Sequence, residues 1–183
     1  ENIYDELNKI ASAVPAGSNK LIVTPWINGE RTPADDNTVR AGIYNVSKTT
    51  TQDDMVRAFF EGVAYNTRWS FQYLERFVGK RLDPLNIIGG GGKSDLWCQI
   101  FADVLNRTVR QVQDPMQANG RGAAFIASVA LGFINFNDIP NLIKYTNVFH
   151  PNPENRKIYD ELFREFVNIY RQNKAIYRRL NKV

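Results

Sequence analysis

The chain has 183 residues, a formal net charge of +4, 43% hydrophobic residues and 12% aromatic residues. This composition can build a hydrophobic core and argues against intrinsic disorder. One cysteine (Cys98) and one histidine (His150) exclude a disulfide scaffold and argue against a structural zinc site. No apolar run reaches the roughly 18 residues of a membrane span, and no signal peptide opens the chain. We therefore expect a cytoplasmic protein with no membrane partner.

The first third of the chain alternates short predicted elements with turns. Residues 3–14 form an amphipathic pattern that predicts a helix, and residues 21–23 and 41–46 predict short strands. Between the strands lies the turn-rich sequence NGERTP, residues 28–33. Because the chain opens at a glutamate and is already amphipathic there, we expect it to be a piece of a longer protein.

A long helix is predicted from a Thr51 cap to about Val78. Acidic residues in its first turn suit the positive end of the helix dipole. Apolar residues at spacings of three and four predict one continuous buried stripe, formed by Val56, Phe60, Val63, Thr67, Phe71, Leu74 and Val78. Gly62 costs roughly 1 kcal/mol relative to alanine inside a helix. A close contact with another helix or a sheet would explain why it is tolerated.

The most informative stretch is residues 85–106, which read LNIIGGGGKSDLWCQIFADVLN. A short apolar run meets four glycines, Gly89 to Gly92, and a helical pattern follows. A strand, a glycine turn and a helix can bring backbone N–H groups and a helix N-terminus up to a nucleotide. The stretch is neither a P-loop, because Ile87 stands where its first glycine is needed, nor a dinucleotide fingerprint, because Ser94 replaces the third glycine. The alternative is a turn that needs glycine only for its backbone or its packing.

The remaining segments continue the alternation of strands and helices. Residues 108–112 predict a strand, Gly120 and Gly122 lie near the start of a helix of small residues, and Asp138 is expected to cap a short helix that runs to about Tyr145. The final segment, residues 154–183, has eight Lys or Arg against four Asp or Glu. Its apolar residues indicate a helix that packs on the core, so we expect no nucleic-acid partner. The pattern as a whole predicts an α/β layered domain.

The order of these segments resembles the C-terminal part of the FGGY carbohydrate kinases, with xylulokinases the most similar group. The matching pieces are NGERTP (28–33), RAFFEGVAYNTRWS (57–70), IIGGGGKSDLWCQIFADVLNRTV (87–109), GRGAAFIASVALG (120–132) and NPENRKIYDELFREFVNIY (152–170). The resemblance implies an actin-like (ribonuclease-H-like) ATPase domain, incomplete at its N-terminal side. Residues 1–183 would then be the C-terminal nucleotide-binding domain, without the sugar-binding domain.

The resemblance also implies a site. Gly89, Gly90 and Gly91 would lie under the adenine or ribose of ATP, and Asp95 would border the base. Aspartate accepts from the adenine amino group but cannot donate, unlike the asparagine found there in related kinases. Two further segments are open to two interpretations. The small residues Gly120, Gly122 and Ala123 could pack tightly on a sheet or touch the nucleotide, and Glu30 and Arg31 could hold their turn by an ion pair or shape the cleft.

The family's catalytic aspartate and phosphate loop have no counterpart in this chain, so we predict no catalytic and no metal-binding residue here. The implied ligands are ATP with Mg²⁺ and a sugar, D-xylulose first and gluconate second. We therefore expect part of an ATP-dependent sugar kinase that is inactive in isolation and could be a homodimer. The alternative is a non-catalytic actin-like domain that binds nucleotides or partners. Cys98 is expected to be buried and inert, and His150 to lie in a loop.

Overall fold

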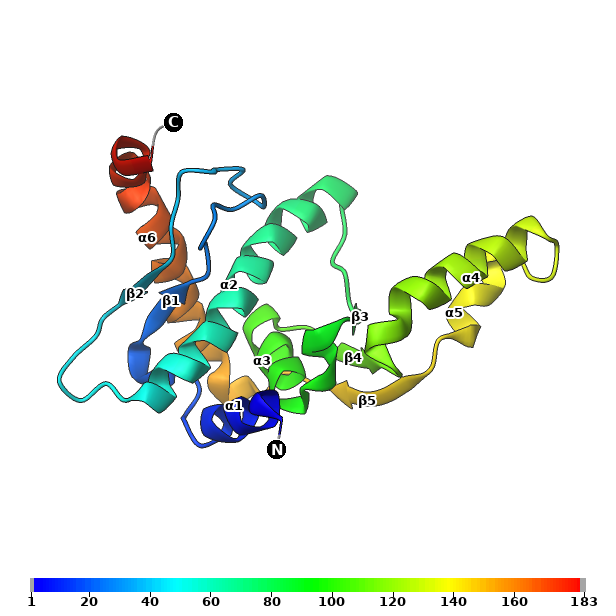
Figure 1. Ribbon diagram of the computed structural model, residues 1–183, viewed down its shortest axis with the longest axis horizontal. Coiled ribbons are helices and arrows are strands. Elements are labelled where there is room, and N and C mark those ends of the chain that lie inside the picture. The colour runs from blue at the N-terminus through cyan, green and yellow to red at the C-terminus, as the bar shows by residue number, and fades with distance from the viewer. Residues whose placement is uncertain (1, 182–183) are drawn as a thin grey trace.

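The computed structural model describes residues 2–181, shown in Figure 1. The helices are α1 (Ile3–Ser12), α2 (Gln52–Val78), α3 (Asp95–Leu105), α4 (Ala118–Ala130), α5 (Ile139–Leu142) and α6 (Arg156–Asn181), and the strands are β1 (Ile22–Thr24), β2 (Gly42–Tyr44), β3 (Leu85–Ile87), β4 (Val109–Val112) and β5 (Tyr145–Phe149). Short 3₁₀ turns connect several of them. The predicted order of strands and helices is confirmed, apart from β5.

Two small sheets lie beside the long helices. Strands β1 and β2 pair antiparallel. The second sheet has the order β3–β4–β5, in which β3 and β4 are parallel and β5 runs antiparallel to β4. Helix α3 connects β3 to β4, as a parallel pair requires a crossover. In Figure 1, α4 and α5 project away from the other helices as an arm, residues 118–142.

Strand β5 was not predicted, and the short helix expected after Asp138 forms but ends before Tyr145. The turn after α4 begins at Asn135, whose side chain and that of Asp138 form a capping box around a 3₁₀ turn. The helix that follows ends at Leu142, and Tyr145 already belongs to β5. Asp138 therefore supports the turn before the helix instead of capping the helix itself. Strand β5 has no buried residue, and its sequence YTNVF gives only a weak hydrophobic strand pattern.

Helix α2 begins as predicted at Thr51. The Thr51 hydroxyl accepts from the N–H of Asp54 at 3.1 Å, and the Asp54 carboxylate accepts from the N–H of Thr51 at 2.8 Å. This reciprocal capping box satisfies two backbone donors that no helical carbonyl can reach. The hydrogen bond from the Thr51 backbone lowers the pKa of Asp54, against the opposing effect of burial.

The buried face of α2 differs from the predicted apolar stripe. Leu74 and Val78 are exposed, and other members of that stripe are only half-buried. The most buried positions include Glu61, which is fully inaccessible, and Arg57, which is 7% exposed. Charged residues four apart usually indicate a solvated helix face, so the burial of this pair is not evident from the sequence. Their burial is tolerated because the surrounding groups complete their hydrogen bonds.

The Glu61 carboxylate accepts four hydrogen bonds. Two come from the loop after α1, from the N–H of Gly17 at 3.0 Å and the hydroxyl of Ser18 at 2.8 Å. The other two come from Arg57 Nε at 2.8 Å and the Tyr159 hydroxyl of α6 at 2.9 Å. Burial raises the pKa of Glu61, while Arg57 and these donors favour its ionised form. One carboxylate thus connects three segments that are distant in the sequence.

An aromatic cluster extends the core from this network along α6. Trp26 packs edge-on against Phe166 and Tyr170 of α6, with ring centroids 5.2 and 5.8 Å apart. Trp69 of α2 lies 5.2 Å from Tyr170. The basic C-terminal helix is therefore a core element, as the apolar pattern predicted, although Ile176 near its end is 42% exposed.

Gly62 allows α2 to approach β1 closely. A Cβ atom at this position would lie 2.3 Å from the carbonyl oxygen of Val23. We expect Gly62→Ala to lower the free energy of unfolding by about 1–3 kcal/mol, because the cost of overpacking exceeds the helix propensity of about 1 kcal/mol that alanine gains. The measurement is urea unfolding. Gly122→Ala, in α4, is the matched control, because no described atom lies within 4 Å of its added Cβ. Equal stability of the two variants would contradict the prediction.

Replacement of Glu61 tests the buried network. Glu61→Gln leaves the Arg57 guanidinium buried without its counter-ion, and we expect a loss of about 3–5 kcal/mol in the free energy of unfolding. Glu165→Gln on the exposed side of α6 serves as the control and should change stability by less than about 0.5 kcal/mol. Thermal and urea denaturation measure both. A Glu61→Gln variant as stable as the control would show that the buried pair contributes little.

Candidate functional site

The glycine turn lies between the end of β3 and the start of α3. Gly89 has φ +79° and ψ −167°, a backbone conformation that is essentially confined to glycine. Residues Gly90–Lys93 then form one 3₁₀ turn. The Ser94 hydroxyl caps α3 by accepting from the N–H of Trp97 at 3.0 Å. The helix therefore begins immediately after the turn, as the sequence predicted.

The four glycines divide into two pairs. A Cβ on Gly91 would lie 3.1 Å from the Trp97 ring, and one on Gly92 would lie 3.0 Å from Pro115 and 3.4 Å from the carbonyl oxygen of Ile87. Packing accounts for these two. A Cβ on Gly89 would meet no heavy atom of the described residues within 4 Å, and one on Gly90 would meet only the Met116 sulfur at 4.0 Å. Gly90 is thus required neither by φ nor by packing, and the turn is open on this side.

Asp95 is the first residue of α3 and is exposed. Its Oδ1 accepts a hydrogen bond of 2.9 Å from Nε2 of Gln111, a buried residue of β4. The same Nε2 donates to the carbonyl oxygen of Gly92 at 2.9 Å. The fold therefore places Gly89–Gly92, Asp95 and Gln111 side by side. Gln111 could not be identified from the sequence, because a single glutamine in a strand carries no distinctive signal.

Lys93 is exposed at the end of the glycine turn. Ser94, the residue after it, forms the cap of α3. The turn also lies against the segment after β4, where the N–H of Gly89 donates to the carbonyl oxygen of Pro115 at 2.9 Å. Two loops at the carboxyl ends of parallel strands thus meet, which is where α/β domains bind ligands.

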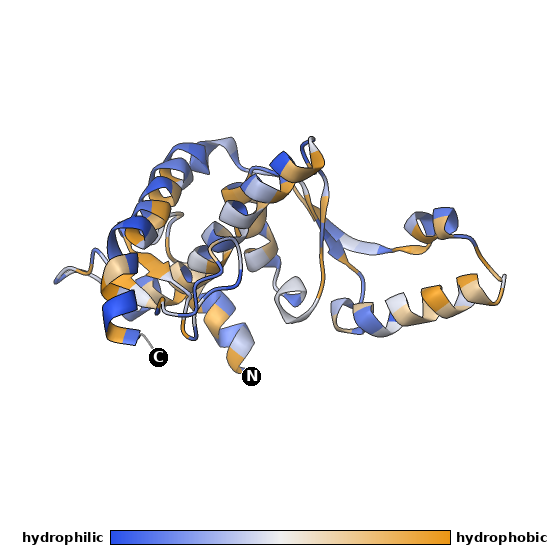
Figure 2. Cartoon of the chain, turned by 90° about the horizontal axis from the view of Figure 1, so that it is seen from above, coloured by the Kyte–Doolittle hydropathy of each residue, from blue (hydrophilic) through white to orange (hydrophobic). Residues whose placement is uncertain are grey.

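The small residues of α4 do not pack on the sheet of this chain. A Cβ on Gly120 or Gly122 would meet no described heavy atom within 4 Å. Helix α4 has no buried residue, and large apolar side chains within it and beyond its end are exposed, Ile126, Leu131, Phe133 and Phe136 among them. Figure 2 shows these hydrophobic segments along the arm. Of the two interpretations, tight helix-on-sheet packing within the described residues is therefore wrong.

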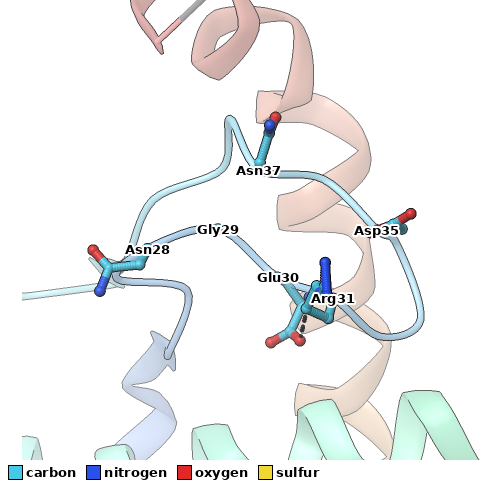
Figure 3. Close-up of a pocket in the computed structure, with 6 residues that line it drawn as sticks. All are labelled: Asn28, Gly29, Glu30, Arg31, Asp35 and Asn37. Carbon is cyan, nitrogen blue, oxygen red and sulfur yellow. Dashed lines mark hydrogen bonds between the residues drawn. The ribbon is translucent and has the colours of Figure 1, made fainter.

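The NGERTP turn forms a small polar pocket, shown in Figure 3. The cavity of about 290 Å³ is lined by Asn28, Gly29, Glu30, Arg31, Asp35 and Asn37. Glu30 Oε1 accepts from the backbone N–H groups of Arg31 and Thr32 at 2.8 and 3.0 Å. Its other oxygen accepts from Asn66 of α2 at 2.9 Å. Glu30 thus supports the turn through its backbone, and the described residues show no ion pair between Glu30 and Arg31.

The residues that could support nucleophilic catalysis or metal binding are placed unfavourably for those functions. Cys98 is fully buried, as expected, and burial raises the pKa of its thiol to about 12, which disfavours the reactive thiolate. His150 is exposed just beyond β5. Within residues 2–181, three or more His, Cys, Asp or Glu side chains never gather as a metal site would require. Among these residues, no helix is long and apolar enough to cross a membrane.

The parallel β3–β4 pair, its crossover helix and the glycine turn define an α/β domain of the kind that binds nucleotides. Residues 1–131 match the family model described as the C-terminal domain of the FGGY family of carbohydrate kinases. The chain therefore belongs to this family.

Several named relatives are similar over most of the chain. The xylulose kinase of Staphylococcus epidermidis is 31% identical over 175 residues, which cover 94% of this chain and 35% of the relative. The gluconokinase of Bacillus licheniformis is 30% identical over 169 residues, covering 92% of this chain and 33% of the relative. The chain thus spans about a third of the length of the relatives it matches.

Solved structures confirm the fold. A ligand-bound xylulose kinase from Lactobacillus acidophilus superposes with a TM-score of 0.86 at 28% identity, covering 96% of this chain and 36% of that one. A gluconate kinase from the same organism gives a TM-score of 0.84 at 27% identity, with the same coverage of both chains. The predicted α/β, actin-like ATPase domain is therefore confirmed as the C-terminal third of an FGGY kinase fold.

Proposed function

We propose that this chain is part of the C-terminal nucleotide-binding domain of an ATP-dependent sugar kinase. The observation that carries the proposal is the glycine turn, which leaves Gly89 and Gly90 open at the end of a parallel strand in a chain of this family. ATP supplies the phosphoryl group, and a sugar hydroxyl receives it. We also propose a cytoplasmic location.

The open side of the turn fits a nucleotide. Without side chains at Gly89 and Gly90, a flat base or ribose can approach the backbone, and the start of α3 presents the positive end of a helix dipole. Asp95 has one carboxylate oxygen without a hydrogen-bond partner among residues 2–181, and that oxygen can accept from the amino group of adenine. The structure of a glycerol kinase from Plasmodium falciparum with ADP shares this fold, at a TM-score of 0.75 and 22% identity.

The chain supplies only one side of a kinase site. Phosphoryl transfer depends on positioning both reactants and on stabilising the charge of the transferred group. Of the carboxylate of Asp95, one oxygen is bound by Gln111 and the other is proposed to accept from the base of the nucleotide, so this carboxylate is not proposed as the general base for a sugar. Magnesium accompanies ATP in such reactions, and the described residues offer it no cluster of ligands. We therefore propose that the catalytic base, the phosphate loop and most of the sugar pocket lie outside this chain, which is inactive alone.

For the sugar, we propose D-xylulose, with D-gluconate as the second candidate. The support is the similarity to xylulose kinases and to gluconokinases, at 31% and 30% identity. We also propose a homodimer, which sedimentation analysis tests directly. A non-catalytic domain that binds nucleotides through the same turn is the alternative, and it predicts ATP binding without phosphorylation of any sugar.

A side chain at Gly90 tests the nucleotide site. Gly90→Val adds atoms on the open side of the turn, where the protein has room for a Cβ, so we expect the fold to persist and ATP affinity to fall at least about tenfold by steric exclusion. Calorimetric titration with ATP on the intact protein measures the change. Lys93→Gln, three residues away and exposed, is the control and should bind ATP nearly normally. Unchanged ATP affinity in Gly90→Val would contradict the proposed site.

The activity of the intact protein tests the reaction and the sugar. We expect ADP release in a coupled assay with ATP and Mg²⁺ that is fastest with D-xylulose and slower with D-gluconate. The intact mass of the same sample is measured in parallel. Activity from a species of 20.9 kDa, the mass of this chain alone, would contradict the proposal that the base lies elsewhere. ATP binding without activity toward any sugar would favour the non-catalytic alternative.

A further inference from the structure

Gln111 is a buried amide between the glycine turn and the third strand of the sheet. It lies on the central strand β4 and is 5% exposed. Its Nε2 donates to the carbonyl oxygen of Gly92 and to Oδ1 of Asp95, both at 2.9 Å. Its Oε1 accepts from Nδ2 of Asn147, its neighbour on β5, at 3.0 Å. The amide thus uses both of its N–H groups and one lone pair of its oxygen.

The orientation of this amide is fixed by the chemistry of its partners. The carbonyl oxygen of Gly92 can only accept a hydrogen bond, so the nitrogen of Gln111 must face it. The amide oxygen then faces β5, where the Asn147 amide donates to it. A flipped amide would place oxygen against oxygen at both Gly92 and Asp95. A single buried side chain therefore holds the last glycine of the turn and the first residue of α3 in a fixed relation.

The hydrogen bond from Gln111 restrains the carboxylate of Asp95. Because Oδ1 is engaged by Gln111, the carboxylate cannot rotate freely, and Oδ2 has no hydrogen-bond partner among residues 2–181. An ionised carboxylate only accepts hydrogen bonds. Asp95 thus presents a fixed acceptor at an exposed position, and a carbonyl group brought against it would be repelled.

We propose that Gln111 is a positioning residue that determines which nucleobase the glycine turn accepts, by holding Asp95 so that its free oxygen selects a base with an exocyclic amino group. This inference rests on the proposed nucleotide site. The site then prefers adenine over hypoxanthine, which carries a carbonyl where adenine carries its amino group. Gln111 contacts no base itself and acts through Asp95 and Gly92.

The test compares ATP with ITP in equilibrium titrations of the intact protein. We expect the wild type to bind ATP about tenfold more tightly than ITP, because one charge-assisted hydrogen bond is replaced by a repulsive contact. Gln111→Met keeps the length and the packing of the side chain but removes the amide. Its ATP-to-ITP affinity ratio should fall severalfold toward one, mostly through weaker ATP binding. Asp95→Asn should lower the ratio as well, since an amide can donate to the carbonyl of ITP.

Three comparisons distinguish a positioning role of Gln111 from a general loss of structure. In the Asp95→Asn background, Gln111→Met should lower the ratio little further, because both substitutions act through the same oxygen. Gln113→Met, two residues along the chain and exposed, is the matched control and should keep the wild-type ratio. Asn147→Ala removes only the hydrogen bond from β5 to the Gln111 amide oxygen and should lower the ATP-to-ITP ratio by a smaller factor. This variant still tests the positioning role if Gln111→Met fails to fold.

The outcomes distinguish this inference from the proposed function. Equal loss of ATP and ITP binding in Gln111→Met, with Asn147→Ala at the wild-type ratio, would overturn the positioning role. Equal binding of ATP and ITP by the wild type would also overturn it, while the nucleotide site itself would stand. Binding of neither nucleotide by the intact protein would overturn both.

Discussion

The buried pair of Arg57 and Glu61 is the constraint on which the arrangement of the helices depends. Glu61 accepts from the loop after α1 and from Tyr159 of α6, while Arg57 also donates to the carbonyl oxygen of Ala11, in α1, at 3.0 Å. A buried charge without its partners is strongly destabilising. All of these segments must therefore be in place together, and the network makes the assembly of α1, α2 and α6 cooperative.

Trp97 links helix α2 to the glycine turn by contacting both. The indole of Trp97 stacks on Phe60 of α2 with ring centroids 5.0 Å apart, and its Nε1 donates to the Phe60 carbonyl oxygen at 3.1 Å. The ring also lies against Gly91, where an added Cβ would be 3.1 Å from it. Gln111 holds the opposite side of the turn from β4. The candidate site is thus held by packing and hydrogen bonds where it meets the protein and is open where a ligand would approach.

The chain has two regions of different character. The helices around Glu61 form an apolar core with an aromatic cluster, whereas the arm of α4 and α5 keeps large apolar side chains exposed. The glycine turn lies where the two regions meet. The proposed one-sided nucleotide site is consistent with a chain that spans about a third of the length of its relatives. In the proposed kinase, the groups that carry out the chemistry come from the rest of the protein.

The sequence alone determined the local features. The Thr51 cap, the glycine turn followed by α3, the close contact at Gly62 and the burial of Cys98 follow from short-range patterns. The order of its motifs also indicated the family. Only the tertiary structure decided which polar residues are buried. Arg57 and Glu61 resemble a surface pair, and Gln111 and Asn147 resemble ordinary strand residues, because their hydrogen-bond partners lie far away in the sequence. Likewise β5 forms because β4 offers it an edge, which no local pattern encodes.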